Sequence, residues 1–477
     1  MSYSIKKALT QVRTCYRRFL EMNRSDCWKL QMCGSESEMR EVAARICRNY
    51  LHGAWKTVAP ADLDFKRISG GLSNFLYYVA LPPPPDHAGV APALPEPDAN
   101  ARDASPDADA ATRLQKHLSS FCMDEPRKVL LRIYGQVHGE RAMDAIVTES
   151  VIFTLLSERR LGPKLHGVFS GGRIEQYIPA RSLLTKELSE PALSMKIAEK
   201  MAAIHNMEVP LSKEPNWLWK TMAKWLRTVK EERLAEGAKG KNEDEDRIIA
   251  RLRAVDWDAE IEFVKKLCGN VHSPVVFCHN DMQEGNILLL EDEAPSGEEE
   301  MSLAQYSRSL EEHSSDSVSS HHSDLGEPRL VLIDFEYCAY NHRGFDIANH
   351  FQEWCYDYTN PHHPFYHERQ EDAPTLEQQE IFLKEYVKHF SGGAEGPRDA
   401  GIDEVNHLLM EVETFALPVN MFWTLWSVVN ASKSQIPFGY WEYALARLET
   451  YYRLKLEIVK KDKSGLPQKR KICEVDI

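Results

Sequence analysis

One segment of the chain, Val276–Leu290, places an acid and an amide in a loop between two apolar runs. The acid is Asp281, and the amide, Asn286, follows it five residues later. A second apolar run, Leu330–Ile333, leads directly into Asp334. A carboxylate that takes up a proton, and an amide oxygen and a further carboxylate that hold Mg²⁺, are groups that a phosphoryl-transfer site requires. The two segments together predict such a site.

We expect each polar group in these segments to have its own role. Asp281 is the candidate base that accepts the proton of a substrate hydroxyl. Asn286 and Asp334 are the candidate metal ligands, and Glu336 would assist through water, because Mg²⁺ prefers oxygen ligands and keeps several waters. His279 is expected to orient the loop rather than to bind metal. The alternative is a surface loop whose polar residues occur there by chance. It is disfavoured because each of the two polar motifs directly follows an apolar run that is expected to be a strand.

The stretch between the two apolar runs, residues 291–328, is acidic, rich in serine and almost free of large apolar side chains. We expect Ile287–Leu290 and Leu330–Ile333 to form two short buried strands, with this stretch as a disordered hairpin tip. A long tip is tolerable because the entropy of loop closure grows only slowly with length. Such a hairpin would bring Asn286 and Asp334 to the same end of adjacent strands, where both can hold one metal ion.

The N-terminal part of the chain has the pattern of an antiparallel sheet with one helix. Phe65–Leu81 predicts a strand, a tight glycine turn and a second strand, while Lys128–Tyr134 predicts another strand and Ala142–Leu161 a helix. Gly167–Ile178 fits a further hairpin, and from Ala192 onward the pattern is mostly helical. A small sheet lobe followed by a larger helical lobe is the two-lobed protein-kinase-like arrangement, an α+β fold.

The small lobe contains residues that could hold a nucleotide. Backbone N–H groups of the Gly70–Gly71 turn and the hydroxyl of Ser73 could bind phosphate oxygens, although such a turn in a hairpin is more often only a turn. Arg132 lies in mid-strand among apolar residues, where protein kinases place a phosphate-binding lysine, and Glu149 on the following helix is its expected partner. Glu175–Ile178 is the expected hinge whose backbone meets adenine.

Composition limits the classes of function. The chain has 477 residues, 43% of them hydrophobic, which is enough for one large two-lobed unit. Its net charge of −14 argues against nucleic acid as the main partner but allows a cationic substrate. The 10 cysteines include no Cys-x-x-Cys pair, which indicates reduced thiols and a cytoplasmic location. No apolar run approaches the roughly 18 residues of a membrane span.

The predicted lobes are accompanied by segments that do not look like core. Residues 1–37 form a basic N-terminal extension with one possible amphipathic helix; a targeting or membrane-surface role and a plain surface helix are both open. The N-lobe is predicted at 38–180, with a disordered insertion rich in Pro, Ala and Asp at about 82–125. The C-lobe is predicted at 181–460, and 461–477 is expected to be a flexible tail.

Several segments of the chain resemble the choline/ethanolamine kinase family, in particular its vertebrate-like members. The resemblance covers roughly residues 40–455 and leaves out the N-terminal extension and both insertions. The run from Asp334 to Trp354 is the part most specific to this family. The matching segments are Ile68–Asn74, Val129–Gly135, Leu161–Leu165, Glu175–Arg181, Phe277–Leu290, Ile333–Trp354 and Phe438–Tyr443.

The resemblance implies an ATP- and Mg²⁺-dependent enzyme that phosphorylates choline, with ethanolamine as a second substrate. That reaction is the first step of the CDP-choline route to phosphatidylcholine. The resemblance also implies that Asn74, Gln176, Ile178 and Arg181 belong to the nucleotide site. The family is commonly dimeric, which implies a homodimer or a heterodimer with a paralogue.

A choline substrate also agrees with the supply of aromatic residues. A quaternary ammonium has no N–H to donate, so aromatic faces must hold it, at about 0.5–1 kcal/mol for an exposed face and about 2 for a desolvated one. Trp423 and Trp426 would share one helical face, while Pro418 predicts a kink in the same helix that could shift them. The positions that match the family's choline pocket are Tyr337, Glu353, Tyr358, Phe365, Trp423, Trp426 and Tyr443.

Other functions remain as alternatives. An aminoglycoside-type or other small-alcohol kinase shares the acid motifs, but its substrates carry many amines and favour acidic pockets over aromatic ones. A kinase of this family that prefers ethanolamine is a further alternative. A protein kinase is disfavoured because neither His-Arg-Asp nor Ala-Pro-Glu is present. A non-catalytic scaffold is disfavoured because Asp281, Asn286 and Asp334 are all retained.

Overall fold

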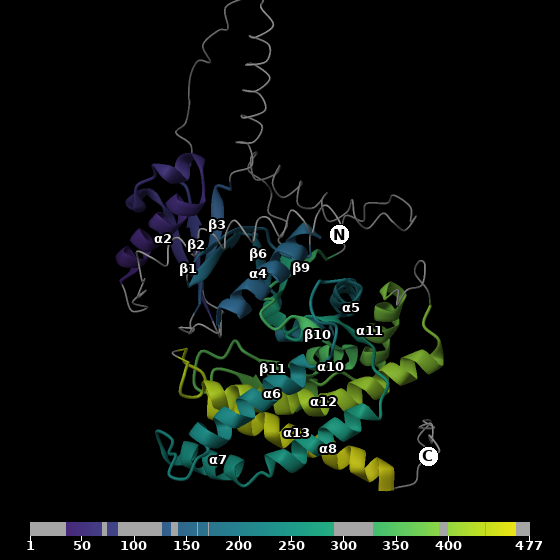
Figure 1. Cartoon of the computed structure of the whole chain (residues 1–477). Coiled ribbons are helices and arrows are strands. Elements are labelled where there is room, and N and C mark those ends of the chain that lie inside the picture. The colour runs from purple at the N-terminus through teal and green to yellow at the C-terminus, as the bar shows by residue number, and fades with distance from the viewer. Residues whose placement is uncertain are drawn as a thin grey trace, which may run out of the picture. The chain divides into compact units, whose positions relative to one another are not determined.

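The computed structural model describes most of the chain, and its elements fall into two units (Figure 1). The first unit takes the described residues within Met1–Val137 and Lys164–Tyr177, and the second takes those within His138–Pro163 and Ile178–Ile477. The described ranges are 35–68, 74–83, 126–134, 142–159, 161–169, 171–290, 328–390, 399–434 and 436–463. Most of the predicted extension, of both insertions and of the tail lies outside them.

The first unit is an antiparallel sheet with one helix against it. Every neighbouring pair in the order β1-β2-β3-β5-β4 is antiparallel, which confirms the predicted N-terminal sheet. The helix α2 begins with a capping box, in which Ser35 and Glu38 each satisfy the other's backbone N–H. The elements are α2 (Glu36–Tyr50), the 3₁₀ turns Gly53–Lys56 and Pro60–Asp62, β1 (Asp64–Ile68), β2 (Asn74–Ala80), β3 (Lys128–Tyr134), β4 (Leu165–Phe169) and β5 (Gly172–Gln176).

The core of this unit forms where one face of α2 meets the sheet. Ala43, Ala44 and Cys47 recur at helical spacing and are buried with strand residues such as Val129 and Leu131. Burying these apolar side chains is the main favourable contribution to folding. This packing fixes β3, the strand that carries Arg132.

The second unit contains short strands and most of the helices. Its strands form a three-stranded sheet in the order β6-β8-β9 and the pairs β10-β7 and β11-β12. The strands are β6 (Ala180–Ser182), β7 (Val275–Cys278), β8 (Ile287–Leu290), β9 (Leu330–Leu332), β10 (Ala339–His342), β11 (Tyr356–Asp357) and β12 (His367–Glu368). Single helical turns lie at Thr185–Ser189, Val229–Arg233, Glu284–Asn286 and Gln370–Asp372.

The long helices of this unit pack beside one another, with α12 against both α10 and α13 (Figure 1). The helix α12 continues through the buried Pro418, so the proline does not end it, and its effect on substrate preference stays a prediction. The helices are α4 (Ala142–Glu158), α5 (Pro191–His205), α6 (Trp217–Thr228), α7 (Glu243–Arg253), α8 (Trp257–Gly269), α10 (Arg343–Glu353), α11 (Leu376–His389), α12 (Ile402–Asn430) and α13 (Tyr440–Lys463). Among the described residues, no helix could cross a membrane.

The helix α4 groups differently from the expectation. The sequence placed it in the small lobe, whereas its contacts assign it to the second unit. One reason is that the Phe153 ring packs edge-on against the Phe335 ring, with centroids 5.8 Å apart. This contact links α4 to the segment that carries Asp334.

The predicted metal-site hairpin is present. The strands β8 and β9 are antiparallel, with Ile287 opposite Leu332. Just beyond this pair, the Ile333 N–H donates to the Asn286 carbonyl at 3.0 Å. Asn286 and Asp334 therefore lie at the same end of adjacent strands, as the apolar pattern predicted.

Candidate active site

The two motif loops both contain a residue with left-handed backbone. Asn280 has φ 65° and Asp334 has φ 63°. Asparagine and aspartate enter this region more easily than most residues, but it is still uncommon. Such positions are held by the surrounding structure and cluster at functional sites. Asn280 directly precedes the candidate base Asp281, so this backbone sets where the carboxylate begins.

The loop is held by a residue that the sequence analysis did not single out, Asp346 on α10. Its Oδ2 accepts the His279 N–H at 2.8 Å and its Oδ1 accepts the Asn280 N–H at 2.7 Å. Burial raises the pKa of Asp346, but hydrogen bonding and charge from His205 outweigh it, so the pKa lies below its ordinary value. A buried, ionised Asp346 therefore anchors the backbone on which Asp281 stands. Its position within the run most specific to the family was the available signal.

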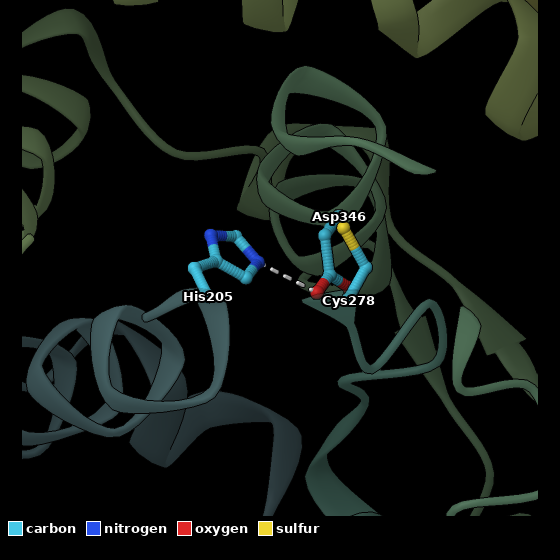
Figure 2. Close-up of side chains that lie close together, drawn as sticks. All are labelled: His205, Cys278 and Asp346. Carbon is cyan, nitrogen blue, oxygen red and sulfur yellow. Dashed lines mark hydrogen bonds and ion pairs between the residues drawn. The ribbon is translucent and has the colours of Figure 1, made fainter. Parts of the chain in front are cut away.

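His205, Cys278 and Asp346 lie close enough together to suggest a metal site (Figure 2). Each of them, however, already has hydrogen-bond partners. His205 bonds Asp346 through Nε2 at 3.0 Å and the Tyr386 hydroxyl through Nδ1 at 2.7 Å. The Cys278 thiol lies 3.6 Å from the Asn341 carbonyl, and burial raises its pKa well above the ordinary value. A neutral thiol is a poor metal ligand, so this group supports the loop instead.

His279 joins the two motif segments. Its Nε2 lies 3.0 Å from the Ile333 carbonyl, and its Nδ1 accepts the Asp281 N–H at 3.3 Å. This pattern corresponds to a neutral imidazole that donates from Nε2. Burial lowers the pKa of His279, in agreement with the neutral form. The contacts match the orienting role predicted for this residue.

Asn286 is turned toward the candidate base. Its Nδ2 donates to the Asp281 carbonyl at 2.8 Å and to Asp281 Oδ2 at 3.0 Å. Both contacts are made by the amide nitrogen, so neither of them uses the amide oxygen. An amide oxygen is the atom that Mg²⁺ would bind, so this orientation fits the role of a metal ligand.

The acids around this loop crowd one another. Burial raises the pKa of Asp281 well above its ordinary value, and the charges of Glu353, Asp334 and Glu336 raise it further, while the Asn286 hydrogen bond opposes the rise. Such crowding of carboxylates is unfavourable unless cations offset it. A site with this excess of negative charge fits a divalent cation and a cationic substrate, which would restore the ionised form of Asp281.

Beside these acids lies a connected group of rings, called here the aromatic cluster: Tyr337, Tyr358, Trp423, Trp426 and Tyr443. The distances between ring centroids are 5.6 Å for Tyr337–Trp423, 5.5 Å for Trp423–Trp426, 6.4 Å for Trp426–Tyr443 and 6.2 Å for Tyr443–Tyr358. The side-chain amide of Asn280 donates to the Tyr337 carbonyl at 2.9 Å, so the cluster begins beside the loop that carries the candidate base. Five of the seven predicted substrate residues thus form one group.

The other two predicted substrate residues relate to this cluster differently. The Phe365 ring contacts the His363 ring at 6.2 Å, and its segment reaches the cluster through the Gly439 N–H, which donates to the Pro364 carbonyl at 2.9 Å. Glu353 accepts a hydrogen bond from the Tyr358 hydroxyl at 2.7 Å. Glu353 therefore belongs with the cluster through its carboxylate.

The sequence analysis missed two further rings of this group. Phe438 lies 5.4 Å from Tyr443 and 6.3 Å from Tyr358, measured between centroids. Tyr440 lies 5.8 Å from Trp426. Both were within a segment that resembles the family, but only contacts can tell a cluster residue from a core residue.

The candidate nucleotide residues of the first unit are only partly described. Gly70, Gly71 and Ser73 lie outside the described residues, and Asn74 stands opposite Tyr134 in the strand ladder. Gln176 Oε1 accepts the Lys164 N–H at 3.1 Å. The nucleotide roles of these residues stay predictions.

Arg132 has a buried acidic partner in its own unit. Its Nε donates to Glu175 Oε1 at 2.7 Å, and Arg173 Nε donates to the same oxygen at 2.6 Å. Burial raises the pKa of Glu175, but the two arginines outweigh it and hold the pKa below its ordinary value. Glu149, the predicted partner of Arg132, is on α4 in the second unit, so that pairing stays a prediction.

The last two candidate nucleotide residues are in the second unit. Ile178 is buried against Leu290 and Val331. Arg181 forms a fork with Glu187, with both N–O distances at 2.7 Å. A forked guanidinium pair is rigid, and the contact of Arg181 with a nucleotide stays a prediction.

Known proteins resemble most of this chain. A family model for choline/ethanolamine kinase matches residues 65–452. The chain is 40% identical to a choline/ethanolamine kinase of Homo sapiens, over 87% of this chain and 85% of that protein. It is 38% identical to one of Rattus norvegicus, over 88% of each chain.

A solved structure gives independent support for the fold. The crystal structure of a choline kinase from Cryptosporidium parvum aligns with a TM-score of 0.58 at 21% identity, over 91% of this chain and 99% of that one. The predicted α+β, protein-kinase-like fold is thereby confirmed. The extent of the family match leads to one conclusion: the chain belongs to the choline/ethanolamine kinase family.

Proposed function

We propose that the protein transfers the γ-phosphate of ATP to the hydroxyl of choline, and less readily to that of ethanolamine. The observation that carries this proposal is that the loop with the candidate base adjoins the aromatic cluster. Tyr337, whose ring begins the aromatic cluster, accepts a hydrogen bond at its carbonyl from Asn280, the residue before the acid that would activate the hydroxyl. A small alcohol with a cationic head matches both parts, since choline carries the two groups only two carbons apart.

Each polar group of the two motif loops is assigned one role in this proposal. Asp281 would accept the hydroxyl proton and orient the oxygen toward the phosphate. Asn286 and Asp334 would hold Mg²⁺ from the shared end of their hairpin, and Glu336 would assist through water. Mg²⁺ held by these residues would supply positive charge that offsets the negative charge of the ATP phosphates. Arg132, held by Glu175, would bind a phosphate of ATP.

The aromatic cluster favours a compact cation over an aminoglycoside as the substrate. An aminoglycoside carries several amines that need acceptors, whereas a quaternary head needs faces. The cluster offers indole and phenol faces, and the indole N–H of Trp423 is already used by Asn349 Oδ1 at 2.7 Å. Trp423 is thereby fixed, and a ligand would meet its ring rather than its N–H.

The assay is transfer of labelled phosphate from ATP with choline, ethanolamine or kanamycin as acceptor. We expect transfer to choline and ethanolamine, and transfer to kanamycin at least about a hundredfold slower, because an unpaired buried polar group is strongly rejected. The removal of Mg²⁺ with a chelator should abolish transfer. Preferred use of kanamycin would overturn the proposal in favour of an aminoglycoside-type kinase.

Replacing Trp423 with alanine should raise the KM for choline roughly thirtyfold, because one desolvated ring face contributes about 2 kcal/mol. The KM for ATP and the kcat should change little, since the acid loop is untouched. Trp423→Phe keeps an aromatic face and serves as the matched control, with a smaller rise in the KM. Steady-state kinetics with each substrate varied will measure both effects, and an unchanged KM for choline would remove Trp423 from the site.

We also propose that the protein is cytoplasmic and dimeric, as a homodimer or with a paralogue. In support of a reducing compartment, the described cysteines Cys47, Cys268, Cys278, Cys338 and Cys355 are all free and buried. Dimerisation rests on the family alone. Light scattering coupled to size-exclusion chromatography measures the mass directly, and a mass near 54.7 kDa would contradict a dimer.

A further inference from the structure

Next to the aromatic cluster lies a buried charge that no sequence motif indicated, Arg447 on α13. Its side chain is 0% exposed, and that of Glu353, its ionic partner, is 2% exposed. Its Nη2 donates to Glu353 Oε1 and, at 2.5 Å, to the Tyr443 hydroxyl. A buried charge is tolerated only when it is paired in this way.

Both carboxylate oxygens of Glu353 accept hydrogen bonds. Oε1 accepts from Arg447, and Oε2 accepts the hydroxyl proton of Tyr358 at 2.7 Å. The Tyr358 and Tyr443 hydroxyls lie 2.8 Å apart. Since Tyr358 has already given its single proton to Glu353, Tyr443 must be the donor to Tyr358. The four side chains therefore form a closed cycle of hydrogen bonds.

The guanidinium of Arg447 also covers ring faces. Its Cζ lies 3.7 Å from the centroid of the Tyr356 ring and 4.9 Å from that of Tyr443. Its Nε and Nη1, by contrast, have no hydrogen-bond partner within the described part of the chain. Buried donors without partners are unfavourable and rare. A contribution to folding stability therefore does not by itself explain why an arginine is at this position. The hydrogen bond by which Arg447 occupies Glu353 Oε1 is the better explanation.

If Arg447 did not contact Glu353, the free carboxylate would change which of the two substrate cations binds more tightly. The primary ammonium of ethanolamine has N–H groups that would form charge-assisted hydrogen bonds to an idle carboxylate. The quaternary ammonium of choline has none and would gain only the weaker non-directional attraction. The Glu353 carboxylate stands at the Tyr358 end of the cluster, so it is within the same group of side chains that would surround the head.

We propose that Arg447 is a specificity-determining residue that occupies Glu353, so that the substrate head is recognised by ring faces and choline is favoured over ethanolamine. Arg447 acts through Glu353 and the two tyrosines and is thus a positioning residue. This inference rests on the proposed function, because it concerns the preference between that function's two substrates.

The test compares kcat/KM for choline and for ethanolamine in single and double variants. Arg447→Met leaves Glu353 unoccupied at Oε1, and the choline-to-ethanolamine ratio should fall at least about tenfold, since a hydrogen bond to a charged group exceeds the 1.4 kcal/mol that corresponds to tenfold. Adding Glu353→Gln to Arg447→Met removes the exposed charge and should restore most of the ratio. Arg453→Met, at an exposed arginine of the same helix, is the matched control and should leave the ratio unchanged.

A milder variant tests the same inference if Arg447→Met does not fold. Tyr358→Phe keeps the ring and frees only Oε2 of Glu353, so the ratio should fall roughly threefold, the effect of one ordinary hydrogen bond. Thermal unfolding of each variant shows whether it is folded.

Equal losses for both substrates in Arg447→Met, or an unchanged ratio in Tyr358→Phe, would overturn the inference. Either result would leave the proposed function intact, because the native protein would still use choline. Failure of the proposed function would instead appear as a native protein that phosphorylates neither substrate.

Discussion

Replacing Asp281 with asparagine is expected to lower the kcat for choline about a thousandfold, within the usual contribution of a positioned base, while ATP still binds. Asparagine keeps the shape of the side chain and an oxygen for the Asn286 amide, which now donates to Asp281 Oδ2 at 3.0 Å. It cannot accept a proton from the substrate hydroxyl. Steady-state turnover gives the kcat, and calorimetric titration with ATP gives the nucleotide affinity.

The same variant should be at least as stable as the native protein. Because the folded state raises the pKa of Asp281, ionising this group is harder in the folded than in the unfolded chain, and the ionised form reduces stability at neutral pH. An uncharged amide removes that penalty, so the melting temperature in the absence of metal should be equal or higher. Near-normal turnover would refute the role of Asp281 as base, and a lower melting temperature would refute the electrostatic account.

Replacing Asp346 with asparagine should lower the kcat about a hundredfold, because a small displacement of a catalytic group has an effect of that size. Its two oxygens accept the N–H groups of His279 and Asn280. An asparagine must direct its own N–H₂ toward one of these donors or break the contact with His205. The loop would shift and carry Asp281 with it, while the aromatic cluster stays in place.

The kinetic signature separates this effect from general instability. The kcat should fall, while the KM for choline stays within about twofold, since ring contacts set it. The free energy of unfolding should fall by about 2 kcal/mol, the value of a hydrogen bond to a charged group. Asp403→Asn, an exposed aspartate at the start of α12, is the matched control for both measurements. A native kcat in Asp346→Asn, with the protein folded, would contradict the anchoring role.

The local features of this site were predictable from the chain alone. The apolar runs Ile287–Leu290 and Leu330–Ile333 are short, continuous and bounded by polar residues, so a buried hairpin was the simple solution. Pairing the strands then required Asn286 and Asp334 to lie at the same end of the hairpin, whatever the length of the tip between them. The helical spacing of Trp423 and Trp426 likewise placed both rings on one face.

The predictions were weaker where a partner had to come from a distant element. The sequence assigned Arg132 a partner on the next helix, and the structure adds Glu175 on the neighbouring strand. It placed α4 with the sheet, whereas the Phe153–Phe335 contact is one of those that group it with the second unit. Neither pairing follows from a repeat or a fixed spacing, since each depends on how separate elements pack.

The sequence by itself therefore determined which chemistry could be predicted: a candidate base, candidate metal-binding oxygens, the two-lobed fold and rings for a cationic head. These depend on residue type and on spacing along one strand, loop or helix, which the period of each element sets. The tertiary structure alone decided how the groups are held. Asp346 accepts the loop N–H groups of His279 and Asn280, and Arg447 donates a hydrogen bond to Glu353. Buried charges and hydrogen-bond donors find partners across long stretches of chain, so only the packed fold shows which groups meet.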